Sequence, residues 1–199
     1  MHLHSMNPSL KNRATLLTLL IGLLSSPLLA QDKFEKEEGV TLSEVPEAAQ
    51  EFISKLQGVK KFKWYKETSD QGVSYEAKSR NPYYSIEFSK DGLLQDVERR
   101  FKWKRLDSEL RESIEAALSK EFDSFRIKEF QTQWTGDENL IITSFNKGEI
   151  LSGITTAFEI VLLGKKDGIS RVYEVLISSE FELLLKRRVI QRQRDNMEL

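Results

Sequence analysis

The sequence predicts an α+β protein made of two tandem units, each with one helix and a four-stranded antiparallel sheet. Two observations predict this fold. First, a helix-like segment followed by four strand-like segments occurs twice, with the helix stripes about 65 residues apart, from Val45 to Leu110. Second, the strand-like segments alternate apolar and polar residues, so one sheet face is expected to be covered and the other open. We expect the units to form one long curved sheet with helices on one face.

The first unit is expected at residues 43–105 and begins with a helix. Ser43 is suited to the N-cap and Pro46 to the first turn, and Gly58 follows the last apolar position. Between them apolar residues recur at three- and four-residue spacing, which is the pattern of one helix face. These residues are Val45, Ala48, Ala49, Phe52, Ile53 and Leu56.

Four strands are expected to follow this helix, and the pair Asp91-Gly92 is the strongest hairpin signal among them. Their ranges are Lys60–Glu67, Val73–Lys78, Tyr83–Ser89 and Leu93–Trp103. The residues expected in the core are Phe62, Trp64, Tyr84, Ile86, Phe88, Val97, Phe101 and Trp103.

The second unit is expected at residues 106–192, and residues 193–199 form a tail. Its helix begins near Asp107, with a stripe from Leu110 through Ile114 and Leu118. An insertion at 136–153 carries an apolar stretch and is interpreted as an extra hairpin that turns at residues 146–148. The four strands are expected at Phe125–Trp134, Thr155–Leu163, Ser170–Ser178 and Phe181–Gln191.

The first thirty residues have the pattern of a secretory signal peptide. Lys11 and Arg13 precede an uncharged stretch from Ala14 to Ala30, and polar sequence begins at Gln31. The alternative is a membrane anchor, but the stretch is near the lower limit of about 17 residues for a span. We expect cleavage near Ala30 and export to the periplasm or beyond. Residues 31–42 are then a charged, flexible lead-in.

Composition excludes several classes of function for the exported chain. Both histidines, His2 and His4, lie in the leader, and the chain has no cysteine. Disulfides, thiol nucleophiles, histidine bases and most zinc or haem sites are therefore excluded. Removing the leader takes Lys11 and Arg13 but no acid, so the net charge changes from −1 to about −3, which does not favour nucleic acid. We predict no enzymatic activity, no cofactor and no metal.

The face of the sheet without helices is the predicted binding surface. It combines tyrosines, which are enriched where proteins meet, with charged side chains. In the second unit we expect Glu159, Glu174, Glu182, Lys186 and Arg188 on this face. The candidate binding residues are Lys63, Tyr65, Lys78, Tyr83, Glu87, Arg100 and Lys102.

Several motifs of the first unit resemble the PepSY-like family of exported bacterial proteins. They are the helix start at 44–48, the Trp-bearing strand at 62–67, the Tyr-Glu-Ala strand at 75–77 and the hairpin with Asp-Gly at 86–94. The second unit matches weakly. This family is related to the β-lactamase inhibitor protein, whose tandem units form one curved sheet. The resemblance implies that the open face binds a partner protein.

We therefore predict an exported, non-enzymatic binding protein that engages an envelope protein through the open sheet face. The alternative is a periplasmic carrier or sensor of a small or lipidic ligand. That ligand would lie between sheet and helices, or under the insertion at 136–153, whose apolar residues favour this alternative.

Overall fold

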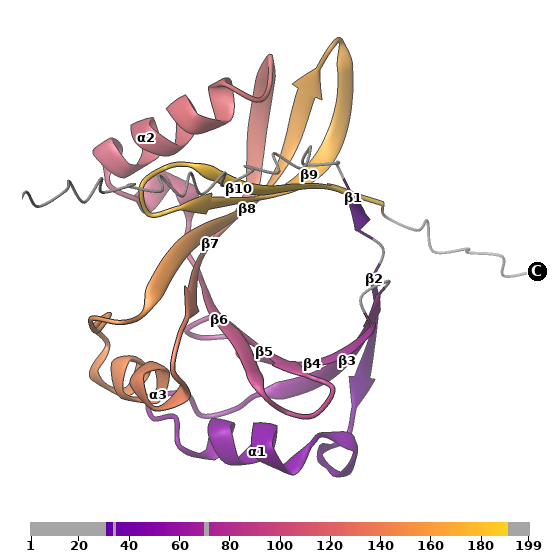
Figure 1. The fold of residues 1–199 in the computed structure, drawn as a ribbon, viewed down its shortest axis with the longest axis vertical. Coiled ribbons are helices and arrows are strands. Elements are labelled where there is room, and N and C mark those ends of the chain that lie inside the picture. Colours follow the sequence, from indigo (N-terminus) through magenta and orange to yellow (C-terminus); the bar gives the residue numbers. More distant parts are fainter. Residues whose placement is uncertain (1–30, 34, 70–71, 191–199) are drawn as a thin grey trace, which may run out of the picture.

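A single continuous sheet forms the body of the protein and curves round into a ring (Figure 1). The computed structural model describes residues 31–33, 35–69 and 72–190. The strand order is β1-β10-β9-β8-β7-β6-β5-β4-β3-β2, and every neighbouring pair is antiparallel except β1 with β10. The first half contributes β2 (Glu35–Val40), β3 (Lys63–Ser69), β4 (Gly72–Lys78), β5 (Tyr84–Ser89) and β6 (Leu94–Arg100). The second half contributes β7 (Ser124–Thr135), β8 (Thr155–Lys166), β9 (Ile169–Ser178) and β10 (Leu183–Val189).

The predicted division into two units of one helix and four strands is wrong. The strands that should have ended one unit and begun the next, β6 and β7, pair with each other from Val97–Arg100 to Gln131–Trp134. This pairing satisfies backbone groups that two separate sheets would leave exposed at their edges. The sheet therefore has nine antiparallel strands in sequence, β2 to β10, with the short β1 (Gln31–Lys33) added in parallel.

The lead-in at residues 31–42, expected to be flexible, forms β1 and β2. β2 pairs with β3 along its whole length, from Glu35 opposite Ser69 to Val40 opposite Trp64. Because β1 pairs with β10 at the far end of the sheet, one chain segment joins the two ends (Figure 1). The charged composition of this segment does not predict a strand. The segment is a strand because its backbone pairs with β3 and β10, which lie far away in the sequence.

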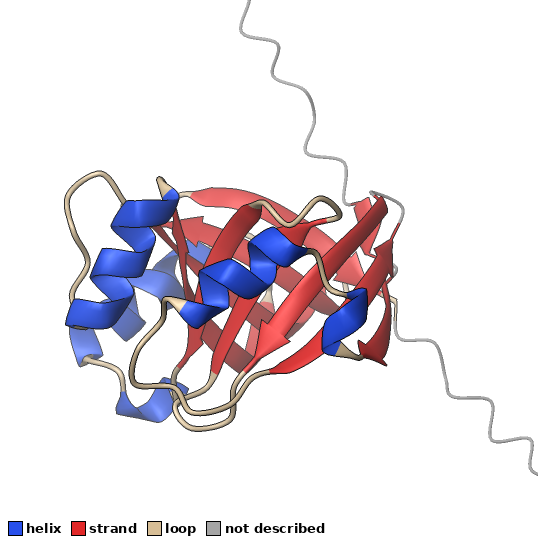
Figure 2. Cartoon of the chain, turned by 90° about the horizontal axis from the view of Figure 1, so that it is seen from below, coloured by secondary structure: helices blue, strands red, loops and turns tan. Residues whose placement is uncertain are grey.

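In the described residues, three α-helices and two short 3-10 helices accompany the sheet, and the α-helices lie on the outside of the ring (Figure 1; seen from below in Figure 2). The α-helices are α1 (Glu47–Ser54), α2 (Ser108–Ser119) and α3 (Glu138–Lys147), and the 3-10 helices are η1 (Leu42–Glu44) and η2 (Trp103–Arg105). α1 buries Ala49 and Phe52 against the first half of the sheet, and α2 buries Ile114 and Leu118 against the second.

The insertion at 136–153 contains a helix, and the hairpin expected there is wrong. The side chain of Asp137 accepts hydrogen bonds from the backbone N–H of Asn139 and Leu140, which caps the start of α3. Gly148 has φ 72° and ends the helix in the left-handed conformation. Ile141 and Phe145 lie one turn apart and are buried in the core of the first half.

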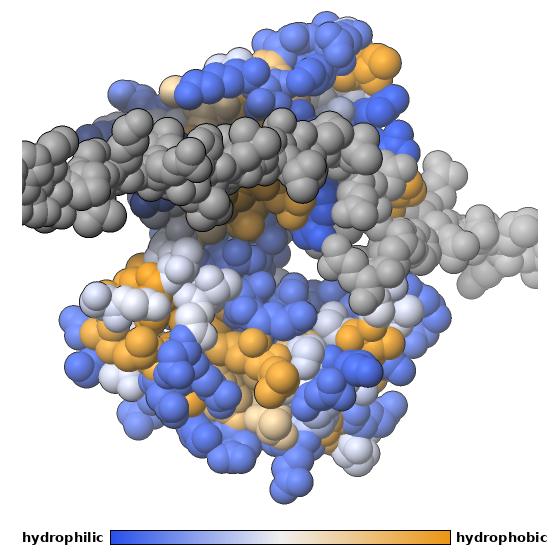
Figure 3. Space-filling model, in the orientation of Figure 1, coloured by the Kyte–Doolittle hydropathy of each residue, from blue (hydrophilic) through white to orange (hydrophobic). Residues whose placement is uncertain are grey.

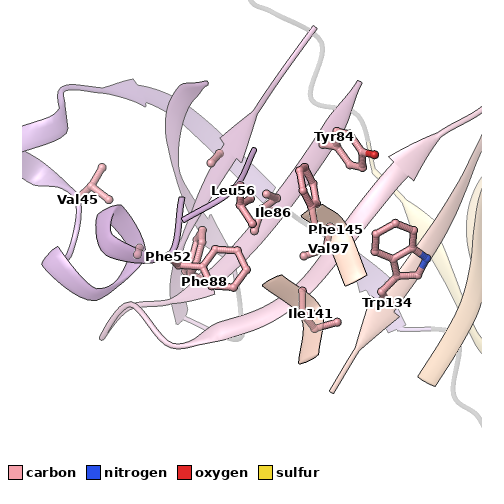
Figure 4. Close-up of a cluster of buried hydrophobic side chains, with 12 residues drawn as sticks. Val45, Phe52, Leu56, Tyr84, Ile86, Phe88, Val97, Trp134, Ile141 and Phe145 are labelled. Atoms are coloured by element: carbon pink, nitrogen blue, oxygen red, sulfur yellow. The ribbon is translucent and has the colours of Figure 1, made fainter. Parts of the chain in front are cut away.

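The core has two parts, one under each half of the sheet. The expected core residues Tyr84, Ile86, Phe88 and Val97 are confirmed as buried in the first part (Figure 4). The Phe52 ring meets the Phe88 ring edge-on, with centroids 5.5 Å apart. Trp134 of β7 belongs to this first part, although β7 is a strand of the second half. Because a strand of the second half contributes to the core of the first half, neither half is a separate unit.

Two hairpin turns contain a glycine with a positive φ, and one of these turns packs closely against the start of α1. Gly92 has φ 84°, and a Cβ built on it would lie 2.8 Å from the Cβ of Pro46, just before α1. Gly168 has φ 78° in the turn between β8 and β9, with nothing within 4 Å of its Cβ position. Both turns need a residue that accepts a positive φ, but only Gly92 also needs an absent side chain.

Candidate functional site

The face of the sheet that the helices leave uncovered becomes the inside of the ring, and we call it the interior face. Strand register fixes which residues share it. Tyr65, Glu76, Glu87 and Asp96 lie opposite one another across β3, β4, β5 and β6. Glu159 lies opposite Gln131 on the neighbouring pair β8 and β7. In Figure 3, hydrophilic side chains lie below the gap between the two halves, and hydrophobic ones are also visible on its upper side.

A cavity of about 240 Å³ lies on this interior face. Five carboxyl groups and one guanidinium group are among its lining groups, so its formal charge is strongly negative. We call it the acidic cavity. It is lined by Glu67, Ser69, Gly72, Val73, Ser74, Glu87, Gln95, Asp96, Glu98, Gln133, Glu159 and Arg187.

A buried hydrogen-bonded group lies at the side of this cavity. The side-chain Nε2 of Gln131 donates to Glu98 Oε2 at 2.6 Å and to Glu159 Oε1 at 3.1 Å. Gln133 donates in the same way to Asp96 Oδ2 at 3.1 Å. Burial, together with the charges of Glu159, Asp96 and Glu87, raises the pKa of Glu98 well above its ordinary value.

Lys78 forms a second charged group on the interior face, outside the lining of the cavity. Its Nζ lies 2.7 Å from Glu76 Oε2 and also bonds Glu37, while the hydroxyl of Ser85 donates to Glu76. Burial lowers the pKa of Lys78, but the carboxylates of Glu76 and Glu37 outweigh it and hold the pKa above its ordinary value. Carboxylate oxygens of Glu37, Glu67 and Glu76 lie within 4.8 Å of one another, and the lysine already supplies positive charge to two of them.

Two tyrosines at the other end of the same strands are each covered by a cation. The Lys78 ammonium lies 5.0 Å from the centre of the Tyr65 ring, and the Arg100 guanidinium lies 3.9 Å from that of Tyr83. Arg100 also bonds Glu129 at 2.6 Å. Burial is the main reason that the pKa of Tyr83 is raised. We call Tyr65, Lys78, Tyr83 and Arg100 the tyrosine rim.

Five of the seven candidate binding residues lie in the two groups just described, the tyrosine rim and the acidic cavity. Four of them form the tyrosine rim, and Glu87 lines the acidic cavity. Lys63 lies opposite Lys78 at the exposed start of β3, and Lys102 lies beyond the end of β6 before η2, in neither group. These positions define the site's extent but do not test its function.

Sequence reasoning missed the residues that surround the buried carboxyls. Asp96, Gln131 and Gln133 lie on expected strands, but only the register of β6 with β7 shows that they meet. Arg187 was missed for another reason, because an irregularity in β10 between Leu183 and Leu185 shifts the alternation by one residue.

The same shift overturns the expected positions of Lys186 and Arg188. Lys186 lies opposite the buried Val175, and its Nζ bonds Glu121 Oε2 at 2.6 Å just after α2. Arg188 lies opposite Tyr173, which packs against the second core. Both residues therefore belong to the helix-covered face and not to the interior face.

The chemistry of the interior face is that of charge and hydrogen bonding. Carboxylates can hold a cation, and adjacent carboxyls can share a proton. Acid–base hydrolysis of glycosides requires two carboxyls about 5–10 Å apart on either side of the bond cleaved. One amide, that of Gln131, bonds both Glu98 and Glu159 and so holds these two carboxyl groups close together.

Comparison with known proteins identifies no family for this chain. No protein-family model matches it, and no curated protein sequence matches it. Among solved structures, it is similar to a DUF2874 family protein from Bacteroides ovatus ATCC 8483. The two chains are 14% identical, the match covers 72% of this chain and 87% of the other, and the TM-score is 0.44.

The expected signal peptide, residues 1–30, lies outside the described residues. Within the described ranges, each helix is too short or too polar to cross a membrane.

Proposed function

We propose that this protein is an exported, non-enzymatic binding protein that takes the ammonium or guanidinium group of a partner into its acidic cavity. The observation that carries the proposal is the cavity lining, in which five carboxyl groups face a space of about 240 Å³. A lysine or arginine side chain, or a small polyamine, has the charge that complements this lining.

The curvature of the sheet also determines what kind of partner can reach the interior face. A flat open face would accept a folded domain, whereas the interior of a ring accepts an extended side chain or a slender molecule. The tyrosine rim fits the same proposal, because tyrosines supply contact area at the ends of strands that line the cavity.

The alternative of a lipidic ligand under the insertion has less support. Ile141 and Phe145, which gave the insertion its apolar character, are buried in the core of the first half. These side chains are therefore used for folding, and the acidic cavity is polar in its lining. A second pocket lies beside α1 and has Leu42, Ile53 and Trp64 in its lining, so a ligand between sheet and helices stays the alternative.

Calorimetric titration with spermidine and with a Lys/Arg-rich peptide tests the proposal and separates its two sources of cation. The protein should bind at least one of them at low ionic strength, and the affinity should weaken as salt is added. The double variant Glu87→Gln/Asp96→Asn should lose at least tenfold in affinity. The matched control Glu112→Gln removes an exposed carboxylate of α2 on the outside of the ring and should bind like the parent protein.

Two outcomes would contradict the proposal. In the first, neither spermidine nor the peptide binds at low ionic strength. In the second, the double variant and the control lose affinity equally, which would mean that binding follows net charge and not the cavity.

A further inference from the structure

The two halves of the ring meet along a short junction, the pairing of Val97–Arg100 in β6 with Gln131–Trp134 in β7. We call this junction the seam. By contrast, the next pair along the sheet, β7 with β8, is in register from Ser124–Lys165 to Thr135–Thr155, apart from one irregularity. Side chains on both faces add to this backbone pairing: Trp134 packs in the first core on the helix-covered face, and polar groups meet on the interior face.

The central interior link at the seam is made by two carboxyl groups and one amide. Gln131 of β7 donates to Glu98 of β6 at 2.6 Å and to Glu159 of β8 at 3.1 Å. Glu98 is 5% exposed and Gln131 is 7% exposed, so water replaces little of this bonding. The same nitrogen thus holds both carboxyl groups, and burial of Glu98 among acidic neighbours disfavours its ionised form, so a proton on Glu98 lies beside the Glu159 carboxyl.

The charged groups around the pair make loss of its proton unfavourable. Asp96 of β6 and Glu87 of β5 face it with negative charge, as do the more distant Glu67 of β3 and Glu76 of β4. Glu129 of β7 is held by Arg100, Glu174 of β9 by Arg187 of β10, and Glu76 by Lys78. Among the described residues, Arg100, Arg187 and Lys78 each form an ion pair with one of these carboxylates.

We propose that Glu98 and Glu159 share one proton at the seam, and that release of this proton as the pH rises weakens the joint between the two halves of the ring. Two adjacent negative charges, with Glu98 buried and Glu159 partly buried, would then repel each other. That this proton controls entry to the acidic cavity rests on the proposed function. The sharing of the proton itself is independent of that function.

The sign of the effect follows from linkage. The pKa of Glu98 is raised in the folded protein, so the folded state holds a proton that the unfolded state has released. The stabilisation that protonated Glu98 provides is complete below the ordinary glutamate pKa. It is lost as the pH rises through the pKa that Glu98 has in the folded protein. Within that window, the unfolding equilibrium constant should rise by up to about tenfold per pH unit.

Urea unfolding between pH 4 and pH 9 tests this proposal without any ligand. The parent protein should lose stability with rising pH, Glu98→Gln should show a flatter profile, and the control Glu112→Gln should follow the parent. An infrared band of a protonated carboxyl should be present in the parent protein at neutral pH and absent in Glu98→Gln. If Glu98→Gln does not fold, Glu159→Gln serves for the same comparison.

Hydrogen exchange locates the effect. Relative to amides of β8 and β9, amides of β6 and β7 at the seam should exchange faster as the pH rises in the parent protein. A parent protein with no protonated-carboxyl band and no loss of stability over this range would overturn the proposal, as would parallel profiles for parent and variant. Failure of cation binding with the pH effect intact would instead overturn the proposed function alone.

Discussion

Replacement of Gly92 by alanine separates the cost of backbone strain from the cost of crowding at the contact between α1 and the sheet. Gly92 and Gly168 both follow an aspartate in a hairpin turn, and their φ angles are 84° and 78°. An alanine at either position is strained by about 1–2 kcal/mol, because its Cβ disfavours the left-handed conformation.

The two sites differ in what surrounds the added carbon. At Gly92 it would lie 2.8 Å from Pro46 Cβ, 3.1 Å from Ala49 N and 3.2 Å from Ala48 Cβ, whereas Gly168 has open space. Crowding of this kind costs a further ~1–3 kcal/mol. Gly92→Ala should therefore lose about 2–5 kcal/mol of unfolding free energy, and Gly168→Ala about 1–2 kcal/mol.

Urea unfolding followed by tryptophan fluorescence measures both values, since Trp64 and Trp134 belong to the first core and Trp103 reports on the second half. The denaturant slope should stay constant, so that the midpoint alone reports stability. Equal losses for the two variants would refute the reasoning, because they would show that α1 does not press on the turn at Gly92.

Three further substitutions test other contacts. Phe88→Ala should cost about 3–5 kcal/mol in urea unfolding, because the ring is fully buried between Phe52 and its neighbours. Asp137→Ala should cost about 1 kcal/mol through loss of the cap on α3, and hydrogen exchange should rise in that helix first. Lys186→Met should remove the bond to Glu121, whose pKa that bond chiefly lowers. Its destabilisation should therefore be present near neutral pH and disappear as the pH falls through the acidic range, as a pH series of unfolding curves would show.

Controls for these three lie in exposed parts of the chain. Leu93→Ala removes a side chain that is 65% exposed and should change stability by less than ~0.5 kcal/mol. Lys147→Met removes an exposed lysine whose nitrogen is 3.9 Å from Glu149, so it should have little effect at any pH. A large loss in either control would contradict the burial on which the predictions depend.

The segments that could be predicted from the sequence are those whose pattern is local. The stripe from Val45 to Leu56 gave α1, and the alternation through Tyr84, Ile86 and Phe88 gave β5 and its buried side. The insertion misled because its β-branched residues favour a strand, whereas the cap at Asp137 and the glycine at 148 favour a helix. For this segment the capping residues predict the helix correctly, whereas the β-branched residues do not.

Other features depend on contacts between distant segments. β2 becomes a strand because β3 presents a free edge, and nothing in residues 35–40 alone indicates it. The carboxyl pair at the seam needs the register of three strands, so Glu98 and Glu159 could be placed on one face but not in contact. One irregularity near Leu183 was enough to exchange the faces of Lys186 and Arg187.

Closure of the ring by residues 31–40 has a consequence for association between molecules. β1 covers the outer edge of β10, and β2 covers that of β3, so a single ten-residue segment protects both ends of an eight-stranded sheet. A chain that began after Val40 would present two rows of unpaired N–H and C=O groups. Such edges pair readily with other strands, and the shortened chain should therefore self-associate more than the longer one.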